Sequence, residues 1–182
     1  MSQFKSTTKW IALLVILMTA SACGNLSNED LIFLAAIPTA NEVELVVQLG
    51  KDLEPVFMAV GCDTTDRTIQ AEAKSKGSSW REAKGFPGAA VVGTWIPYEF
   101  GEYDIGLTVN GELRQSSNTS LMVHSVNTLI AALSEKENLT EGDLIFTGTP
   151  AGVGSLTPGD EVKAWLKDDK EARISYFSAT CE

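Results

Sequence analysis

The sequence has very little histidine and cysteine: one histidine, His124, and three cysteines, Cys23, Cys62 and Cys181. Three cysteines without a Cys-x-x-Cys pair do not make a disulfide framework. A zinc site of the usual cysteine and histidine type also lacks its ligands. Basic residues are scarce too, with 14 Lys and Arg against 24 Asp and Glu. An excess of negative charge repels phosphate backbones, so nucleic acid is not an expected partner.

Long apolar runs are missing except near the start of the chain. There, Lys5 and Lys9 precede an apolar run over residues 10–18, and small residues follow. This order is typical of a signal peptide. The run is shorter than the roughly 20 residues of a membrane-spanning helix. We therefore predict that residues 1–22 are a targeting segment and not part of the fold.

Cys23 follows the small residues directly and precedes Gly24. The segment resembles a bacterial lipoprotein signal, in which this cysteine becomes the lipidated N-terminus, although Ala20 stands where such signals usually have leucine. The resemblance implies lipidation of Cys23, a polar tether over residues 23–30 and attachment to the membrane of the cell envelope. Lipid chains on one cysteine would hold a soluble domain firmly. The alternative is ordinary export to the periplasm or the medium.

The remaining residues, 31–182, suit one globular domain, because 44% of the chain is apolar and 21% is charged. Short strands separated by turn residues dominate the pattern. The expected strands are 43–49, 104–109, 112–115, 144–147, 161–166 and 173–178, and the expected helices are 68–76 and a segment capped by Ser125. This pattern predicts an α+β fold made mostly of antiparallel β-structure.

Two acidic side chains, Glu42 and Glu44, flank Val43 at the start of a predicted strand. Residues two apart on a strand point to the same face. Neighbouring carboxylates repel each other, and a hard cation such as Mg²⁺, Mn²⁺ or Ca²⁺ relieves that repulsion. Taken alone, the same pair is also typical of a solvent-exposed strand.

Further polar residues follow in chain order. Asp63 is a candidate third ligand, and Arg67 and Gln70 lie one helical turn apart, where a guanidinium group could bind a substrate carboxylate. Lys84 stands between Trp80 and Phe86, where desolvation could tune it for catalysis and lower its pKa. Taken alone, each signal is more typical of surface polar residues, or of a lysine that extends to solvent.

A glycine-rich loop over residues 147–154 follows a predicted strand. It lacks the Gly-Lys-Ser/Thr sequence of a phosphate-binding loop. Its glycines would allow the backbone to approach a ligand closely.

The order of these blocks resembles the C-terminal catalytic domain of the fumarylacetoacetate hydrolase superfamily, in particular its acylpyruvase and 2-oxo-acid decarboxylase or isomerase branch. The matching blocks are 42–44, 61–70, 74–77 with Trp80, 83–86, 110–115, 118–120 and 142–154. The resemblance implies that family's β-roll, here shortened on its N-terminal side, and a homodimer.

Residue by residue, the resemblance implies metal ligands at Glu42, Glu44 and Asp63. It implies substrate binding by Arg67, Gln70 and Thr149, and a catalytic role for Lys84. The implied cofactor is Mg²⁺, or alternatively Mn²⁺ or Ca²⁺.

The implied activity is metal-assisted C–C bond hydrolysis, decarboxylation or enol–keto isomerisation of a small 2-oxo acid or 1,3-dicarbonyl acid. One departure matters: the family's His-x-x-Glu, which activates water, has no counterpart before Glu42. Without a general base, hydrolysis would lose about 10²–10⁴-fold in rate. Decarboxylation or isomerisation is therefore favoured, and the alternative is a catalytically inactive family member that binds a ligand or another envelope component. His124 lies far downstream among apolar residues, and we expect it to be a packing residue without a catalytic role.

Overall fold

The computed structural model describes residues 17–18, 32–34, 39–79 and 81–181. The strands are β1 (Leu17–Met18), β2 (Ile32–Leu34), β3 (Thr39–Asn41), β4 (Val43–Leu49), β5 (Pro55–Asp63), β6 (Thr65–Asp66), β7 (Ala90–Val92), β8 (Ile96–Pro97), β9 (Asp104–Val109), β10 (Glu112–Asn118), β11 (Leu144–Phe146), β12 (Gly154–Leu156), β13 (Glu161–Lys167) and β14 (Arg173–Cys181). The helices are α1 (Arg67–Lys76), α2 (Arg81–Lys84), the 3-10 helix η2 (Thr119–Leu121) and α3 (Val126–Ser134).

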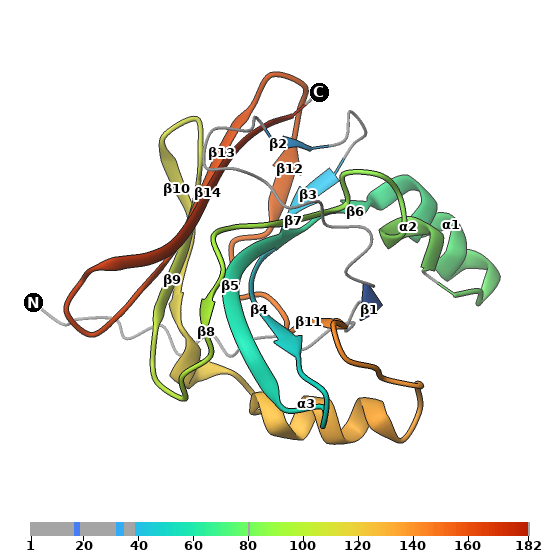
Figure 1. The fold of residues 1–182 in the computed structure, drawn as a ribbon. Helices are drawn as coiled ribbons and strands as arrows, with labels where there is room; N and C mark the ends of the chain where they lie inside the picture. Colours follow the sequence, from blue (N-terminus) through green and yellow to red (C-terminus); the bar gives the residue numbers. More distant parts are fainter. Residues whose placement is uncertain (1–16, 19–31, 35–38, 80, 182) are drawn as a thin grey trace, which may run out of the picture.

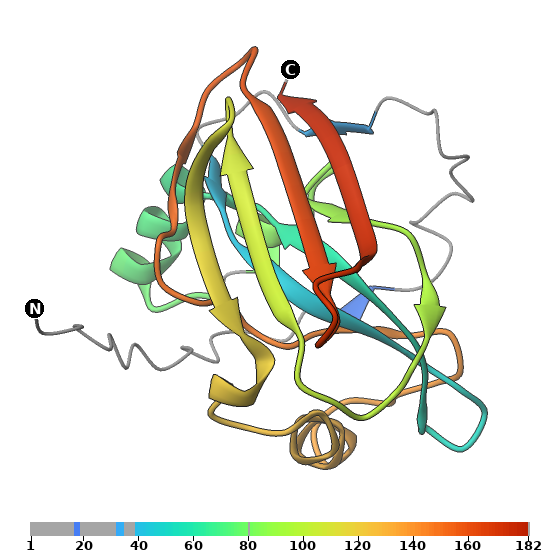
Figure 2. The ribbon, with the colours of Figure 1, turned by 90° about the vertical axis from the view of Figure 1, so that its left-hand side faces the viewer.

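The described strands form three sheets (Figures 1 and 2). One sheet has the order β1-β11-β4-β5-β7, with β8 also paired to β5, and a second has the order β10-β9-β13-β14-β2. A small third sheet joins β12, β3 and β6. Every strand pair among the described residues is antiparallel except β14 with β2. The predicted α+β class with mostly antiparallel strands is confirmed.

The main core lies between the first two sheets. Alternate residues of β4, beginning with Val43 and Leu45, pack in one apolar cluster with side chains of β9, β13 and β14 such as Leu107 and Leu166. The intervening side chains of β4, Glu44 and Val46, must point to the opposite face because side chains alternate along a strand. That second face is also covered, and the polar site described below lies on it.

Local signals in the sequence explain several boundaries. Asp66 begins α1 by accepting hydrogen bonds from the backbone N–H groups of Thr68 and Ile69, and Gly77 ends it in the left-handed conformation, with φ of 62°. Ser125 caps α3, as predicted. Asn110 and Gly111 both have positive φ, 51° and 79°, which fits the two-residue turn predicted between β9 and β10.

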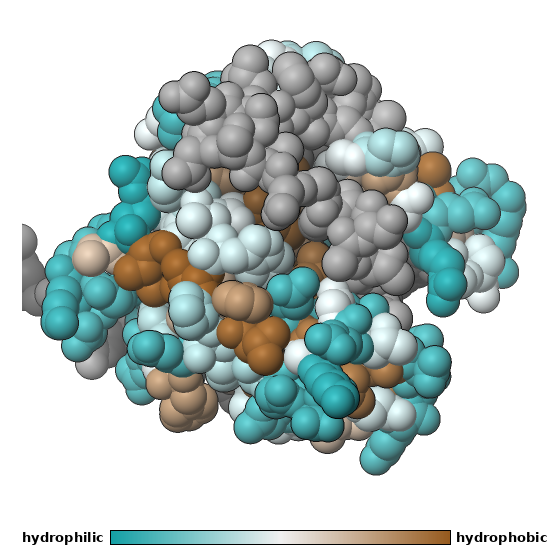
Figure 3. Space-filling model, in the orientation of Figure 1, coloured by the Kyte–Doolittle hydropathy of each residue, from teal (hydrophilic) through white to brown (hydrophobic). Residues whose placement is uncertain are grey.

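Helix α1 lies at one end of the β4–β5 sheet and α3 lies at the other (Figure 1). The surface over α1 is strongly hydrophilic, and the apolar side chains of described residues that are visible on this face form small patches (Figure 3). Within the part of the chain that the structure describes, no helix is long and apolar enough to cross a membrane.

Most of the predicted targeting segment, and all of the predicted tether with Cys23, lie outside the described residues. Two residues of the targeting segment are described: Leu17 and Met18 form β1, which pairs with Ile145 and Leu144 of β11. Removal of residues 1–22 stays a prediction, and it would remove this short edge strand as well.

Candidate metal centre

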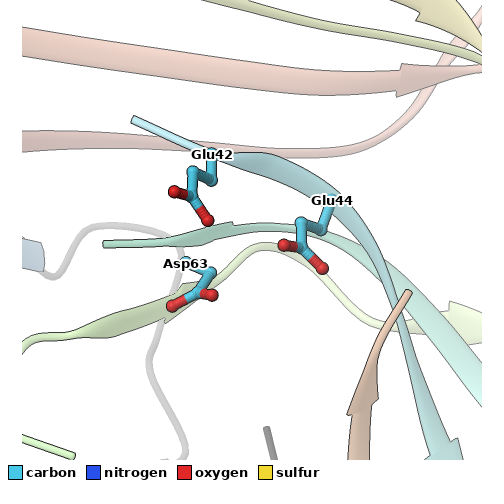
Figure 4. Close-up of side chains that lie close together, drawn as sticks. All are labelled: Glu42, Glu44 and Asp63. Carbon is cyan, nitrogen blue, oxygen red and sulfur yellow. The ribbon is translucent and has the colours of Figure 1, made fainter. Parts of the chain in front are cut away.

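Three carboxylates meet where β4 and β5 pair. Glu42 immediately precedes β4, Glu44 is the second residue of that strand, and Asp63 ends β5. The Asp63 N–H donates a 2.9 Å hydrogen bond to the Glu42 carbonyl, and Glu44 lies opposite Gly61. One carboxylate oxygen from each side chain lies within 4.8 Å of those of the other two. Figure 4 shows the three side chains lying close together, as the strand spacing of Glu42 and Glu44 and the family resemblance for Asp63 predict.

These carboxylates are almost fully removed from solvent. Glu44 is 1% exposed and Asp63 is 0% exposed. Glu44 Oε2 accepts a 2.6 Å hydrogen bond from the Gly148 N–H. Its other oxygen, Oε1, and Asp63 Oδ1 are buried and accept no hydrogen bond from any described residue. Buried carboxylate oxygens without a partner are costly, and a bound cation would remove that cost.

Burial also changes the acidity of the cluster. Desolvation raises the pKa of Glu44 well above its ordinary value, and the negative charge of Asp63 adds to the shift. The pKa of Asp63 rises to about 7, mainly because of burial, although the nearby Lys84 opposes the shift. At neutral pH without a cation, the cluster therefore holds negative charge poorly.

Two basic side chains partly balance the three acids. The Lys84 ammonium group at the end of α2 donates to Glu42 Oε2 at 2.9 Å and also to Asp63 Oδ2. The Arg67 Nη2 group donates to Glu42 Oε1 at 2.8 Å. Three acids against two bases leave an excess of one negative charge when all five groups are ionised. All candidate ligand atoms are oxygens, the donors preferred by Mg²⁺, Mn²⁺ and Ca²⁺, so the donor set fits such an ion.

Without a cation, the pKa of Lys84 does not fall as expected from burial, and the fall expected beside a bound cation stays a prediction. Burial does lower the pKa of the Lys84 ammonium group, but the adjacent Asp63 and Glu42 carboxylates outweigh that effect and raise it above its ordinary value. The lysine is therefore a charged partner of the carboxylates. This state suits a proton donor better than a free base.

The other predicted site residues lie around this cluster. Arg67 Nη1 donates a 2.7 Å hydrogen bond to Gln70 Oε1, so the pair shares one side of α1 as predicted. The Gln70 residue is buried, whereas the Arg67 side chain is 42% exposed and can reach a molecule arriving from solvent. Their role in substrate binding stays a prediction, as do the catalytic role of Lys84 and the metal-ligand role of the three acids.

Thr149 lies in the glycine-rich loop after β11, next to the strand that carries Glu44. Its hydroxyl group donates to the Val43 carbonyl at 2.8 Å and accepts from Gln115 Nε2 at 2.9 Å. The single hydroxyl proton is thus used inside the protein. A substrate carboxylate accepts hydrogen bonds only, so it could not receive that proton without breaking the bond to Val43.

Sequence reasoning missed three contributors to the site: Thr65, whose hydroxyl donates to Glu42 Oε1 at 3.2 Å, the backbone N–H of Gly148, and the buried amide of Gln115. Gln115 was visible in the sequence only as part of a matching block. His124 is exposed, so the expectation that it packs among apolar side chains is wrong. Trp80, expected beside Lys84, lies outside the described residues.

The sequence of this chain is similar to known proteins of one family. Residues 36–175 match the family model for the fumarylacetoacetate (FAA) hydrolase C-terminal domain. The mitochondrial oxaloacetate tautomerase of Mus musculus is 40% identical over 140 residues, which cover 69% of this chain and 63% of that protein. An uncharacterised protein of Pyrococcus abyssi is 39% identical over 141 residues, covering 70% of this chain and 63% of the relative. The chain thus spans about three fifths of the length of these curated relatives.

Solved structures give the same result. A yeast fumarylacetoacetate hydrolase family protein superimposes with a TM-score of 0.77 at 29% identity, covering 90% of this chain and 76% of that one. The fumarylpyruvate hydrolase of Pseudomonas aeruginosa, crystallised with Mn²⁺ and pyruvate, gives a TM-score of 0.73 at 29% identity, covering 84% and 71%. The family match extends over most of the chain and includes all three carboxylates. The chain belongs to the fumarylacetoacetate hydrolase C-terminal domain family.

Proposed function

We propose that this protein binds one divalent cation, Mg²⁺ or Mn²⁺, through Glu42, Glu44 and Asp63, and catalyses enol–keto exchange of a small 2-oxo acid. The observation that carries the proposal is the pair of buried, unpartnered oxygens, Glu44 Oε1 and Asp63 Oδ1, in a cluster with an acidic excess. An oxaloacetate tautomerase among the relatives and a related hydrolase solved with Mn²⁺ and pyruvate support the choice of substrate class and ion.

A bound divalent cation would supply a Lewis acid that stabilises negative charge developing on the 2-oxo oxygen of the substrate. The protein's own side chains would bind and orient the acid. Arg67 is held by Gln70 and is partly exposed, so its guanidinium group can pair with a substrate carboxylate. That pairing would compete with the present Arg67–Glu42 ion pair.

Enol–keto exchange moves one proton between C3 and the oxygen on C2, and atoms and charge balance without water. Lys84 is the buried basic side chain in the described part of the site, and its ammonium group donates hydrogen bonds to Glu42 and Asp63. We assign it the role of proton donor to C3 in the enol-to-keto direction. A C3–H bond forms as the enol O–H bond breaks, and the proton released from that oxygen restores the ammonium group of Lys84. Hydrolysis would also need a group that activates water, and the one histidine in the sequence, His124, is followed three residues later by Asn127, so it is not part of a His-x-x-Glu pair. Isomerisation is therefore favoured over C–C bond hydrolysis.

The purified chain should be assayed with Mg²⁺ or Mn²⁺ against enol oxaloacetate and a panel of acylpyruvates, with Glu44→Gln as the inactive control. We expect metal-dependent loss of the enol absorbance with wild type and none above background with the control. Metal binding without turnover of any 2-oxo acid would favour the alternative, an inactive ligand-binding family member. Absence of metal binding would refute the proposal.

We also propose that the domain over residues 31–182 is attached to the bacterial cell envelope through a lipid on Cys23. The proposal rests on the signal-like order of residues 1–22 before that cysteine. Mass spectrometry of membrane fractions should find acylated Cys23 at the N-terminus, and Cys23→Ser should release or trap the protein. An intact Met1 on protein from the soluble cytoplasm would exclude the anchor.

A further inference from the structure

Gln115 is a fully buried amide on a strand that is otherwise largely accessible. It is 0% exposed, whereas the other residues of β10 are exposed or half-buried. A buried amide that lacks its hydrogen bonds costs about 1–3 kcal/mol. A hydrophobic residue would fill the same space without that risk, so the contacts of this amide indicate what it does.

All four hydrogen-bonding positions of the Gln115 amide are used. Its Oε1 accepts from Asn41 Nδ2 and from the Val43 N–H, each at 2.9 Å. Its Nε2 donates to Thr149 Oγ1 at 2.9 Å and to the Pro150 carbonyl at 3.0 Å. One side chain therefore joins β10 to the start of β4 on one side and to the glycine-rich loop on the other.

These bonds close a ring around Val43. The Val43 N–H donates to Gln115, Gln115 donates to Thr149, and Thr149 donates back to the Val43 carbonyl at 2.8 Å. Both polar groups of the Val43 backbone are thus fixed by side chains. Val43 lies directly between Glu42 and Glu44, so the ring fixes the short backbone segment from which both carboxylates project.

The loop is also held from its other side. Gly148 donates its N–H to Glu44 Oε2 at 2.6 Å. At Gly152, where φ is 102°, an added Cβ would lie 2.1 Å from the Arg114 carbonyl, so the loop approaches β10 as closely as a glycine allows. Contacts therefore connect Gln115 to the loop and the loop, through the Gly148 N–H, to Glu44.

We infer that Gln115 is a positioning residue of the metal centre: its amide sets the relative placement of Glu42, Glu44 and the Thr149 loop without touching ion or substrate. The inference rests on the proposed function. Groups that orient metal ligands typically change metal affinity by 10–100-fold when they are removed. In this arrangement the Thr149 hydroxyl group is a link in the same ring.

The test measures Mn²⁺ affinity by calorimetry and melting temperature without metal for Gln115→Met, which keeps the length of the side chain and removes its amide. The matched control is Ser175→Ala in β14. Ser175 is also 0% exposed and joins two strands, accepting from the Val60 N–H at 3.0 Å and donating to the Thr94 carbonyl at 2.6 Å, outside the carboxylate cluster. We expect both variants to melt lower, and only Gln115→Met to bind Mn²⁺ at least tenfold more weakly.

A second variant, Thr149→Val, breaks the same ring at another link and decides the test if Gln115→Met does not fold. We expect its Mn²⁺ affinity to fall at least threefold. Affinities within twofold of wild type in the folded ring variants would overturn the inference and leave the proposed function standing. A wild-type protein that binds no Mn²⁺ would instead refute the proposed function, and the inference with it.

Discussion

The Lys84 ammonium group donates a 2.9 Å hydrogen bond to Glu42 Oε2, although the two residues are 42 positions apart in the chain. The same group also bonds Asp63 Oδ2. A lysine at the end of α2 therefore serves as a built-in counter-ion for two of the three clustered carboxylates. Glu44 is left with a backbone N–H as its hydrogen-bond partner, which makes it the acid with the weakest compensation for its negative charge.

Glu44→Gln should separate stability from metal binding. The substitution removes a buried carboxyl group whose pKa is raised by desolvation and by the charge of Asp63. It keeps a side-chain oxygen that can accept the hydrogen bond from the Gly148 N–H. We expect the metal-free melting temperature to equal or exceed that of wild type at pH 8, and Mn²⁺ affinity to fall at least about 100-fold, or about 2.7 kcal/mol. Thermal melting and calorimetry measure the two effects.

The matched control is Glu72→Gln on α1, where the glutamate is exposed and pairs with Lys76. This change should alter neither the metal-free melting temperature nor the Mn²⁺ affinity appreciably, because exposed ion pairs contribute about 0–1 kcal/mol to stability. Wild-type Mn²⁺ affinity in Glu44→Gln would remove Glu44 from the proposed ligand set.

The pH dependence of stability should carry the signature of Asp63. Its pKa rises from 3.8 to about 7 in the folded protein, so between these values the folded state holds a proton that the unfolded chain has released. Stability of the metal-free protein must then fall as pH rises through this window. Because the ion needs the ionised carboxylate, Mn²⁺ affinity should rise over the same window.

Melting curves in EDTA from about pH 4 to pH 8 test the first statement, with Asp63→Asn as the reference that cannot titrate. As pH rises from 3.8 to about 7, the melting temperature of wild type should fall relative to that of Asp63→Asn. If the melting temperatures of the two proteins instead change with pH in parallel, Asp63 does not have a raised pKa in the folded protein.

Part of this site could be predicted from the sequence, because two carboxylates at positions i and i+2 of a strand share a face whatever that strand pairs with. Asp63 could be placed beside them only by family resemblance. Its actual position depends on the pairing of β4 with β5, in which Gly61 lies opposite Glu44. Gln115 gave no signal of burial, since the polar residues around it in β10 read as an exposed strand.

The strands and helices likewise fall into those that the sequence predicts and those that it does not. Strands beside the recognisable turn at Asn110 and Gly111 were predicted well at that turn: β9 matches over its whole length, and β10 begins at Glu112 as expected but continues three residues beyond the predicted end at Gln115. β5 was not predicted: its apolar run does not alternate because its second half is buried on both faces, and its preceding turn places Leu53, a residue with no turn preference, at a φ of 61°. Helix α2 has four residues, too few to show a helical period.

Gly152→Ala should disturb the site by pushing the glycine-rich loop away from β10. The new Cβ would lie 2.1 Å from the Arg114 carbonyl in a backbone conformation that already disfavours alanine. We expect a loss of stability of more than about 1 kcal/mol and weaker Mn²⁺ binding. Gly159→Ala is the control, since Gly159 has a similar φ of 90° with no atom within 4 Å of the added Cβ. Equal effects of the two substitutions would show that the close approach to β10 is unimportant.

Lys84→Met tests whether the buried lysine is a counter-ion alone or also a proton donor. The residue is 4% exposed, and its removal leaves Glu42 Oε2 and Asp63 Oδ2 without their buried cation. Breaking a buried ion pair costs about 3–5 kcal/mol. The metal-free variant should therefore melt well below wild type, and Mn²⁺ should raise its melting temperature by more than it raises that of wild type.

Lys84→Arg separates the two roles, because arginine keeps the positive charge beside Glu42 and Asp63 but does not release a proton at working pH. If Lys84 donates the proton to C3, both variants should lower kcat for enol oxaloacetate by about 100-fold or more, which is about 2.7 kcal/mol of transition-state stabilisation. Only Lys84→Met should also lose metal-free stability. Turnover retained in Lys84→Arg but lost in Lys84→Met would assign the lysine an electrostatic role. Unchanged turnover in both variants would place the proton-transfer group elsewhere in the site.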